Sequence, residues 1–223
     1  MCGTCGCAHQ TITLEQKILA RNDELAARNR DWLAQRGVLA INLMSSPGAG
    51  KTTLLERTAR DLGLVLSVIE GDQETALDAS RISAAGCKVV QINTGAGCHL
   101  DAAMVAGALT ELDPPALSVL MIENVGNLVC PALFDLGETA RVVISSVTEG
   151  DDKPAKYPHM FARADLVLVN KTDLLPYLDF DLARHAADIK RLSPAAQILE
   201  VSAVTGSGMA DWYSWLLRPP ARG

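Results

Sequence analysis

The sequence has no excess of positive charge: its 223 residues include 20 Lys and Arg against 26 Asp and Glu, for a net charge of −6. Nucleic acids and anionic membrane surfaces attract basic proteins, so we expect neither as a partner. No apolar run reaches the ~18 residues that span a bilayer, and the N-terminus lacks the basic and apolar segments of a signal peptide. These absences predict a cytoplasmic protein.

The sequence also lacks a disulfide framework, an internal repeat and a low-complexity segment. Three of its six cysteines fall within the first seven residues. This usage is typical of reduced thiols, some of them metal ligands, in a cytosolic protein. An apolar content of 48% is enough for one substantial domain with a large core, plus an extension.

A glycine-rich stretch, residues 45–53 (SSPGAGKTT), connects an apolar run at 38–44 with a helical pattern. Such a turn aims backbone N–H groups and the helix dipole at one point, where phosphates bind. Lys51 would reach the β- and γ-phosphates, and the Thr52 hydroxyl would ligate Mg²⁺. Ser45 stands where the usual pattern has its first glycine. The residues expected to bind the phosphates are Gly48, Ala49, Gly50, Lys51, Thr52 and Thr53.

From residue 38 onward, apolar runs alternate with helical patterns. Continuous apolar runs are typical of strands covered on both faces, and the alternation predicts an α/β fold with a mostly parallel sheet between two layers of helices. Ligands of such sheets gather at the carboxyl edge of the strands. The expected strands are 38–44, 64–70, 88–93, 117–123, 142–147, 166–170 and 197–201.

The segment before this domain divides into an arm and a helix. Thr13 and Gln16 have the spacing of a capping box, which predicts that a helix begins there, and Gly37 is its expected stop. The apolar residues near one face of this helix, which we expect to dock on the domain or on a partner, are Leu14, Ile18, Leu25 and Leu33. The predicted divisions are a cysteine-rich arm (1–10), a helix (11–37) and a P-loop domain (38–223).

A tetrad after the sixth expected strand, Asn170-Lys171-Thr172-Asp173, resembles the guanine-recognition motif of GTPases. The Asp173 carboxylate can accept from guanine N1–H and the 2-amino group, a pair of donors that adenine lacks. Further on, Ser202-Ala203 resembles the signal that contacts guanine O6. The three motifs in this order predict binding of GTP and GDP. The residues expected to bind the base are Asn170, Lys171, Asp173, Ser202 and Ala203.

Two acidic residues at strand ends are candidates for the chemistry. Asp72 lies where GTPases hold Mg²⁺ or the attacking water, and Glu123 replaces aspartate in a D-x-x-G-like motif that ends at Gly126. Phosphoryl transfer needs mostly positioning and charge neutralisation, which these groups can supply. Ordinary strand-end acids are the alternative, and no arginine is evident for the task, so we expect slow turnover. The expected catalytic residues are Lys51, Asp72 and Glu123, and the expected Mg²⁺ ligands are Thr52, Asp72 and Glu123.

The arm carries three thiols, Cys2, Cys5 and Cys7, close enough to wrap around one ion. If Met1 is removed, the free α-amine adds a fourth ligand, and nitrogen with thiolates suits square-planar Ni²⁺. Zn²⁺ would draw the same thiolates toward a tetrahedron. A disulfide between two of the cysteines, or an arm without a ligand, are the alternatives.

A second constellation is Cys98-His99 with Cys130. Both segments follow expected strands and should leave the same edge of the sheet, with Cys130 just past Gly126. Two thiolates and an imidazole would make an incomplete site for Zn²⁺ or Ni²⁺, completed by water or a second protomer. Taken singly, each cysteine is more typical of a buried structural thiol, and it is the combination with His99 that favours a metal site.

Five motifs, C-x-x-C-x-C, SSPGAGKTT, C-H after T-G-x-G, ENVGNLVCP and NKTD, occur in this order. In this combination essentially the whole chain resembles the HypB family, GTPases that assist nickel insertion into nickel–iron hydrogenases. The resemblance implies a Rossmann-like P-loop fold of the SIMIBI class, a GTP-dependent homodimer, and action with a HypA-like metallochaperone toward the hydrogenase large subunit. It assigns nickel to Cys2, Cys5 and Cys7, and a second metal site to Cys98, His99 and Cys130.

Three other functions remain open from the sequence alone. They are a metal store with vestigial GTPase activity, a GTPase switch whose cysteines sense redox state, and a GTPase that serves urease or another nickel enzyme. The intact Lys51, Thr52 and Asp173 argue against a store. The cysteine motif of the arm argues against the urease GTPases, and the absence of a histidine-rich stretch argues against bulk nickel storage.

Overall fold

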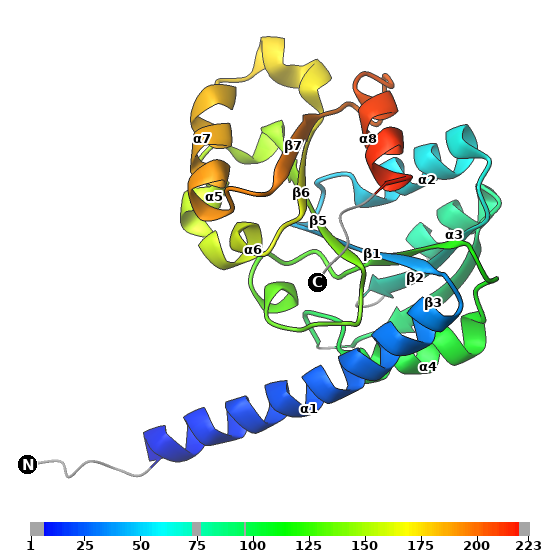
Figure 1. Cartoon of the computed structure of the whole chain (residues 1–223). Helices are drawn as coiled ribbons and strands as arrows, with labels where there is room; N and C mark the ends of the chain where they lie inside the picture. The colour runs from blue at the N-terminus through cyan, green and yellow to red at the C-terminus, as the bar shows by residue number, and fades with distance from the viewer. Residues whose placement is uncertain (1–6, 73–76, 96, 219–223) are drawn as a thin grey trace, which may run out of the picture.

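The computed structural model describes residues 7–72, 77–95 and 97–218 (Figure 1). Its centre is a seven-stranded sheet in the order β3-β2-β4-β1-β5-β6-β7, and each pair of neighbours is parallel. The predicted α/β fold with a parallel sheet is therefore confirmed. The strands are β1 (Leu39–Ser45), β2 (Leu66–Asp72), β3 (Lys88–Asn93), β4 (Val119–Glu123), β5 (Ala140–Ser146), β6 (Leu166–Asn170) and β7 (Gln197–Glu200).

Helices cover both faces of this sheet because its inner strands are apolar on both sides. The α-helices are α1 (Cys7–Gln35), α2 (Lys51–Leu62), α3 (Leu77–Ala84), α4 (Ala102–Leu112), α5 (Lys153–Lys156), α6 (Pro158–Ala162), α7 (Leu182–Leu192) and α8 (Met209–Leu216). Short 3₁₀ turns are η1 (Cys130–Ala132), η2 (Val147–Glu149) and η3 (Thr172–Tyr177).

Successive residues of the central strand β1 point into different core layers. Ile41 packs with residues of α2, α3 and α8, whereas Ala40 packs with residues of α1 and α4. Met44, on the same face as Ala40, packs with residues of α6 and α7. The sheet is thus the middle of three layers, and every residue of β5 is buried.

Helix α1 starts earlier than predicted, and only part of its predicted apolar face lies against the domain. It begins at Cys7, so Thr13 lies inside the helix and is not its cap. Leu33 is buried as expected, but Leu14 and Ile18 are 61% and 52% exposed. The N-terminal half of α1 extends away from the domain (Figure 1). Within the described ranges, no helix has both the length and the apolar character to span a bilayer.

Candidate nucleotide and metal sites

The turn between β1 and α2 forms one wall of a cavity of about 450 Å³. Gly48 and Gly50 have φ angles of 74° and 99°, which residues with a Cβ rarely adopt. The Lys51 ammonium donates to Ser45 Oγ at 2.9 Å. The serine that replaces the usual glycine therefore holds the lysine that is expected to contact phosphate.

A second cavity of about 260 Å³ shares Gly50, Thr53 and Lys171 with the first. Asp173 and Ser202 line this second cavity, and the Ser202 hydroxyl donates to Asp173 Oδ1 at 2.5 Å. The other lone pairs of the carboxylate stay available for a ligand. The two cavities together make one elongated site, with Lys51 at one end and Asp173 at the other.

Asn170 connects the two ends of this site. Its buried amide donates to Ala49 O at 2.9 Å, and its Oδ1 accepts from Ala203 N at 3.2 Å. A Cβ at Gly50 would lie 2.6 Å from Asn170 Nδ2, so only glycine fits there. Lys171 adds a further link, since its ammonium donates to Gly48 O at 2.7 Å.

Carboxylates gather at the phosphate end. Thr52 Oγ1 donates to Glu123 Oε1 at 2.9 Å, and Asp72 and Glu70 line the same cavity. Burial raises the pKa of Glu123 to about 7, and burial together with the nearby Glu123 raises that of Glu70 to about 8. Burial also lowers the pKa of Lys51. Oε2 of Glu70 and Oε2 of Glu123 are buried without a hydrogen-bond partner among the described residues.

Two residues that line this cavity were not predicted from the sequence to have a role. Arg81 of α3 lines it and contacts Glu56 at 2.8 Å, although no arginine was expected there. Glu70 was placed inside an expected strand with no role. No local pattern marks either residue, because the pairing of β2 with β4, which sets Glu70 beside Glu123, and the packing of α3 bring them to the site.

The raised carboxylate pKa values predict how stability depends on pH. The folded protein without nucleotide keeps protons on Glu70 and Glu123 that an unfolded chain releases near pH 4.5. Because the folded state binds more protons, the part of its stability that depends on these two groups is fully present below that pH and is lost as pH rises to about 8. We expect the melting temperature to fall between pH 6 and 8.5, by about 2–4 °C for each kcal/mol lost.

Calorimetry of the nucleotide-free protein across this pH range checks the expectation. Glu70→Gln should flatten the dependence, whereas Glu111→Gln, a change at an exposed position on α4, should leave it as in the wild type. An identical slope for the wild type and Glu70→Gln would contradict it.

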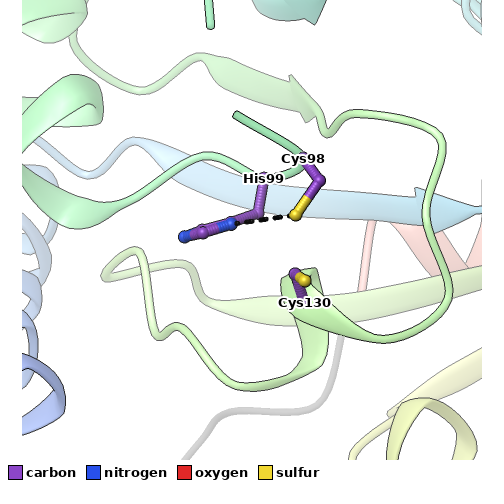
Figure 2. A group of neighbouring side chains, drawn as sticks. All are labelled: Cys98, His99 and Cys130. Carbon is purple, nitrogen blue, oxygen red and sulfur yellow. Dashed lines mark hydrogen bonds between the residues drawn. The ribbon is translucent and has the colours of Figure 1, made fainter. Parts of the chain in front are cut away.

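The structure brings Cys98, His99 and Cys130 together, as Figure 2 shows. One potential ligand atom from each lies within 4.8 Å of the other two. His99 Nδ1 is 3.6 Å from Cys98 Sγ, and its ring stacks on Phe134 with centroids 4.0 Å apart. Burial lowers the pKa of His99, which favours the neutral imidazole that metals bind. The donor set fits a thiophilic divalent ion.

A single segment, residues 123–130, connects the two sites. It begins at Glu123 in the nucleotide cavity and ends at Cys130. Between them, Asn124 Oδ1 accepts from Leu100 N at 3.2 Å, and Asn127 donates to Cys98 O at 3.3 Å. This segment therefore carries Cys130 and is also hydrogen-bonded to the backbone at Cys98 and Leu100, on either side of His99.

The arm lies mostly outside the described residues. Cys2 and Cys5 fall there, and of Cys7 only the backbone is described, as the first residue of α1. The proposed nickel motif of the arm therefore stays a prediction. The other site residues predicted from the sequence all belong to described segments: the carboxyl ends of strands, the loops and turns that follow them, or the first turn of α2.

Comparison with known proteins gives concordant matches. The model of the family described as CobW/HypB/UreG, nucleotide-binding domain, matches residues 39–200. The hydrogenase maturation factor HypB of Rhizobium leguminosarum bv. viciae is 56% identical over 213 residues, 95% of this chain and 71% of that protein. The crystal structure of HypB from Archaeoglobus fulgidus has a TM-score of 0.83 at 42% identity, covering 89% of this chain and 98% of that one. HypB from Helicobacter pylori in complex with nickel also has a TM-score of 0.83, at 39% identity, covering 88% and 94%.

Proposed function

This chain belongs to the CobW/HypB/UreG family of nucleotide-binding proteins, and on that premise we propose that it is a GTP-hydrolysing nickel metallochaperone. It binds Ni²⁺ and delivers it in the cytoplasm during maturation of nickel–iron hydrogenase. One observation carries the proposal: a cysteine–histidine cluster suited to a metal lies at the end of a segment that begins in the nucleotide site.

The preference for guanine rests on Asp173, at the end of the site away from Lys51. Asp173 accepts from Ser202 and keeps lone pairs for the N1–H and 2-amino groups of the base. Lys171, whose side chain crosses to Gly48 O, provides an alkyl surface along one face of the base cavity. Ala203 N is already bonded to Asn170, so the loop that follows β7 is held in position.

Hydrolysis rests on the phosphate end. Lys51 places a cation among the phosphate oxygens, and the backbone N–H groups of the turn bind them at the start of α2. The hard oxygen donors of Thr52, Glu123 and Asp72 fit Mg²⁺, and the buried Oε2 of Glu123, which has no hydrogen-bond partner among the described residues, could serve as one of its ligands. When bound, Mg²⁺ would neutralise phosphate charge. Turnover is slow, because the other cations that line the described cavity are already engaged, Arg81 with Glu56 and Lys171 with Gly48 O.

Metal handling rests on the cluster of Cys98, His99 and Cys130, which takes Ni²⁺ or Zn²⁺. The relative from H. pylori whose structure holds nickel supports nickel as the cargo. A γ-phosphate that moves the segment from Glu123 would move Cys130 and change the affinity for the metal. By linkage, the metal changes nucleotide affinity by the same factor.

The remaining parts serve capture and partner binding. Cys2, Cys5 and Cys7 take up Ni²⁺, and a homodimer formed with GTP completes the incomplete cluster. A HypA-like metallochaperone is the partner in transfer, and the hydrogenase large subunit is the final, indirect recipient. Leu14 and Ile18, exposed on the extended half of α1, offer an apolar surface for such a partner.

Titration of the reduced full chain with Ni²⁺ and Zn²⁺ tests this function. Thiolate–metal absorption is followed with GDP or a non-hydrolysable GTP analogue present. We expect a tight Ni²⁺ site that Cys2→Ala removes and a weaker site that Cys130→Ala removes. The weaker site should change affinity between the two nucleotides by roughly 5–150-fold, the usual range of such coupling.

Cys87→Ser is the matched control, because this buried thiol lies in the core below α2 and α3, apart from both proposed sites. It should retain both metal sites. No specific metal binding, or a weaker site that responds identically to the two nucleotides, would sink the proposal, and redox sensing by the cysteines would then be the better explanation.

A further inference from the structure

Helix α1 buries two asparagines on the face that packs against the domain. Asn22 and Asn29 are 6% and 5% exposed, and their separation of two turns places them on one side of the helix. A buried amide without partners is costly, so each must be hydrogen-bonded. The hydrogen-bond partners of these two side chains therefore show which segments α1 holds in place.

All four of their bonds go to the backbone of two distant segments. Asn22 Oδ1 accepts from Ala102 N at 2.9 Å, and its amide donates to Asp135 O at 2.8 Å. Asn29 donates to Ala102 O at 2.9 Å and to Leu136 O at 3.0 Å. The two asparagines thus clamp the start of α4 to the loop before β5.

These two segments carry His99 and the ring it stacks on. Ala102 comes three residues after His99, and Asp135 directly follows Phe134. The His99 and Phe134 rings are 4.0 Å apart with an angle of 24° between their planes. A shift of either segment relative to α1 would move one ring of this stack.

Helix α1 packs tightly against the loop that contains Asp135 and Gly137, so the two can shift little relative to each other. Arg30 donates to both carboxylate oxygens of Asp135, at 2.7 and 2.8 Å. Gly137 approaches the helix so closely that a Cβ there would lie 2.5 Å from Ala26 O. Close packing of this kind passes a displacement on rather than absorbing it.

We propose that Asn22 and Asn29 are positioning residues of the metal centre, which hold the His99 imidazole in register with Cys98 and Cys130. The inference rests on the proposed function in one respect, that a metal binds at this cluster. It makes α1 a part of the centre, so that the helix leading from the arm and the metal ligands move together. Groups that orient a metal-binding imidazole typically change metal affinity about 10–100-fold when they are lost.

Co²⁺ binding provides the test, because its absorption bands report both affinity and the ligands bound. The full chain carries Cys2→Ser, Cys5→Ser and Cys7→Ser, so that the arm offers no thiol. In this background we expect Asn29→Ala, and equally Asn22→Ala, to weaken Co²⁺ binding about 10–100-fold. The d–d bands should shift as the imidazole is lost, while the two-thiolate charge-transfer band and the affinity for GDP are retained.

Arg36→Ala is the matched control. Arg36 pairs with Asp113 at 2.7 Å and ties the opposite end of α1 to the loop after α4. This variant should bind Co²⁺ like the parent. The comparison distinguishes a general weakening of the contact between α1 and the domain from loss of the hydrogen bonds of Asn22 and Asn29. If an asparagine variant does not fold, Phe134→Leu tests the same link, since it removes the stacking ring and keeps an apolar side chain.

The Co²⁺ results distinguish the role of the two asparagines from the existence of the metal centre. Wild-type affinity and an unchanged Co²⁺ spectrum in the folded Asn22→Ala and Asn29→Ala variants would overturn the inference and leave the metal centre intact. Absence of Co²⁺ binding in the parent background would overturn the metal centre itself and the inference with it.

Discussion

Asp173→Asn is expected to lower the affinity for GTP on the order of 10⁴-fold, because a site built to accept a donor pair rejects a ligand that its new group repels. The amide nitrogen of asparagine is a donor, and it would face the 2-amino group of guanine, also a donor. Xanthine carries a carbonyl at that position. We therefore expect the variant to bind xanthosine nucleotides far better than the wild type does.

The structure indicates that Asp173→Asn can be made without disturbing the neighbouring hydrogen bond. Ser202 Oγ, 2.5 Å from Asp173 Oδ1, can donate to the new amide oxygen or accept from the new amide nitrogen. The loop should therefore keep its shape, and only the pattern presented to the base changes. Equilibrium binding of GDP and xanthosine diphosphate measures the effect.

Asp179→Asn is the control, an exposed acid a short distance along the chain. It should bind GDP as the wild type does. If Asp173→Asn retains guanine affinity and gains nothing for xanthine, another group recognises the base.

Lys51→Ala should reduce GTP hydrolysis about 10²–10³-fold, the usual cost of removing one preorganised group that stabilises developing charge. Lys51 is 8% exposed, and its ammonium lies in a cavity whose lining also includes Glu70, Asp72 and Glu123. The other cations there are engaged, Arg81 with Glu56 and Lys171 with Gly48 O, so loss of Lys51 leaves phosphate facing these carboxylates with less positive charge to offset them. Affinity for GTP should fall as well, so turnover must be measured at saturating nucleotide.

Phosphate release under single-turnover conditions gives the rate, and Lys156→Ala, at an exposed position outside the cavity, serves as control. Turnover that is equal in Lys51→Ala and in the wild type would refute a role for Lys51 in hydrolysis. It would also revive the possibility of a metal store with a vestigial GTPase domain.

The strands and the family were accessible from sequence because their signals are local. All seven expected strands are present, and β3 and β6 match their expected bounds residue for residue. Continuous apolar runs mark strands buried on both faces, and nearly every inner strand here is of that kind. Membership of the HypB-related family, expected from the order of the motifs, is confirmed by the comparisons.

Helix α1 shows why the contacts between distant segments could not be predicted from the sequence. The sequence predicted an apolar face of Leu14, Ile18, Leu25 and Leu33, of which Leu33 is buried. The other buried residues in the part of α1 whose burial is described are Asn22, Ala26 and Asn29. An asparagine in a helix normally indicates a solvent-exposed position, since its amide needs partners. Here the partners are backbone groups of segments more than seventy residues away, such as Ala102 and Asp135, and no local pattern encodes them.

The amide of Asn170, which bonds to both Ala49 and Ala203, has a consequence for how binding free energy is used. The loops that contact base and phosphate are joined before any nucleotide arrives, so the entropy of ordering them is lost on folding rather than on binding. GDP and GTP meet the same preassembled frame at the base end. In the proposed metal transfer, any difference between the two nucleotides would therefore arise at the γ-phosphate, at the end of the site where Glu123 begins the segment that leads to Cys130.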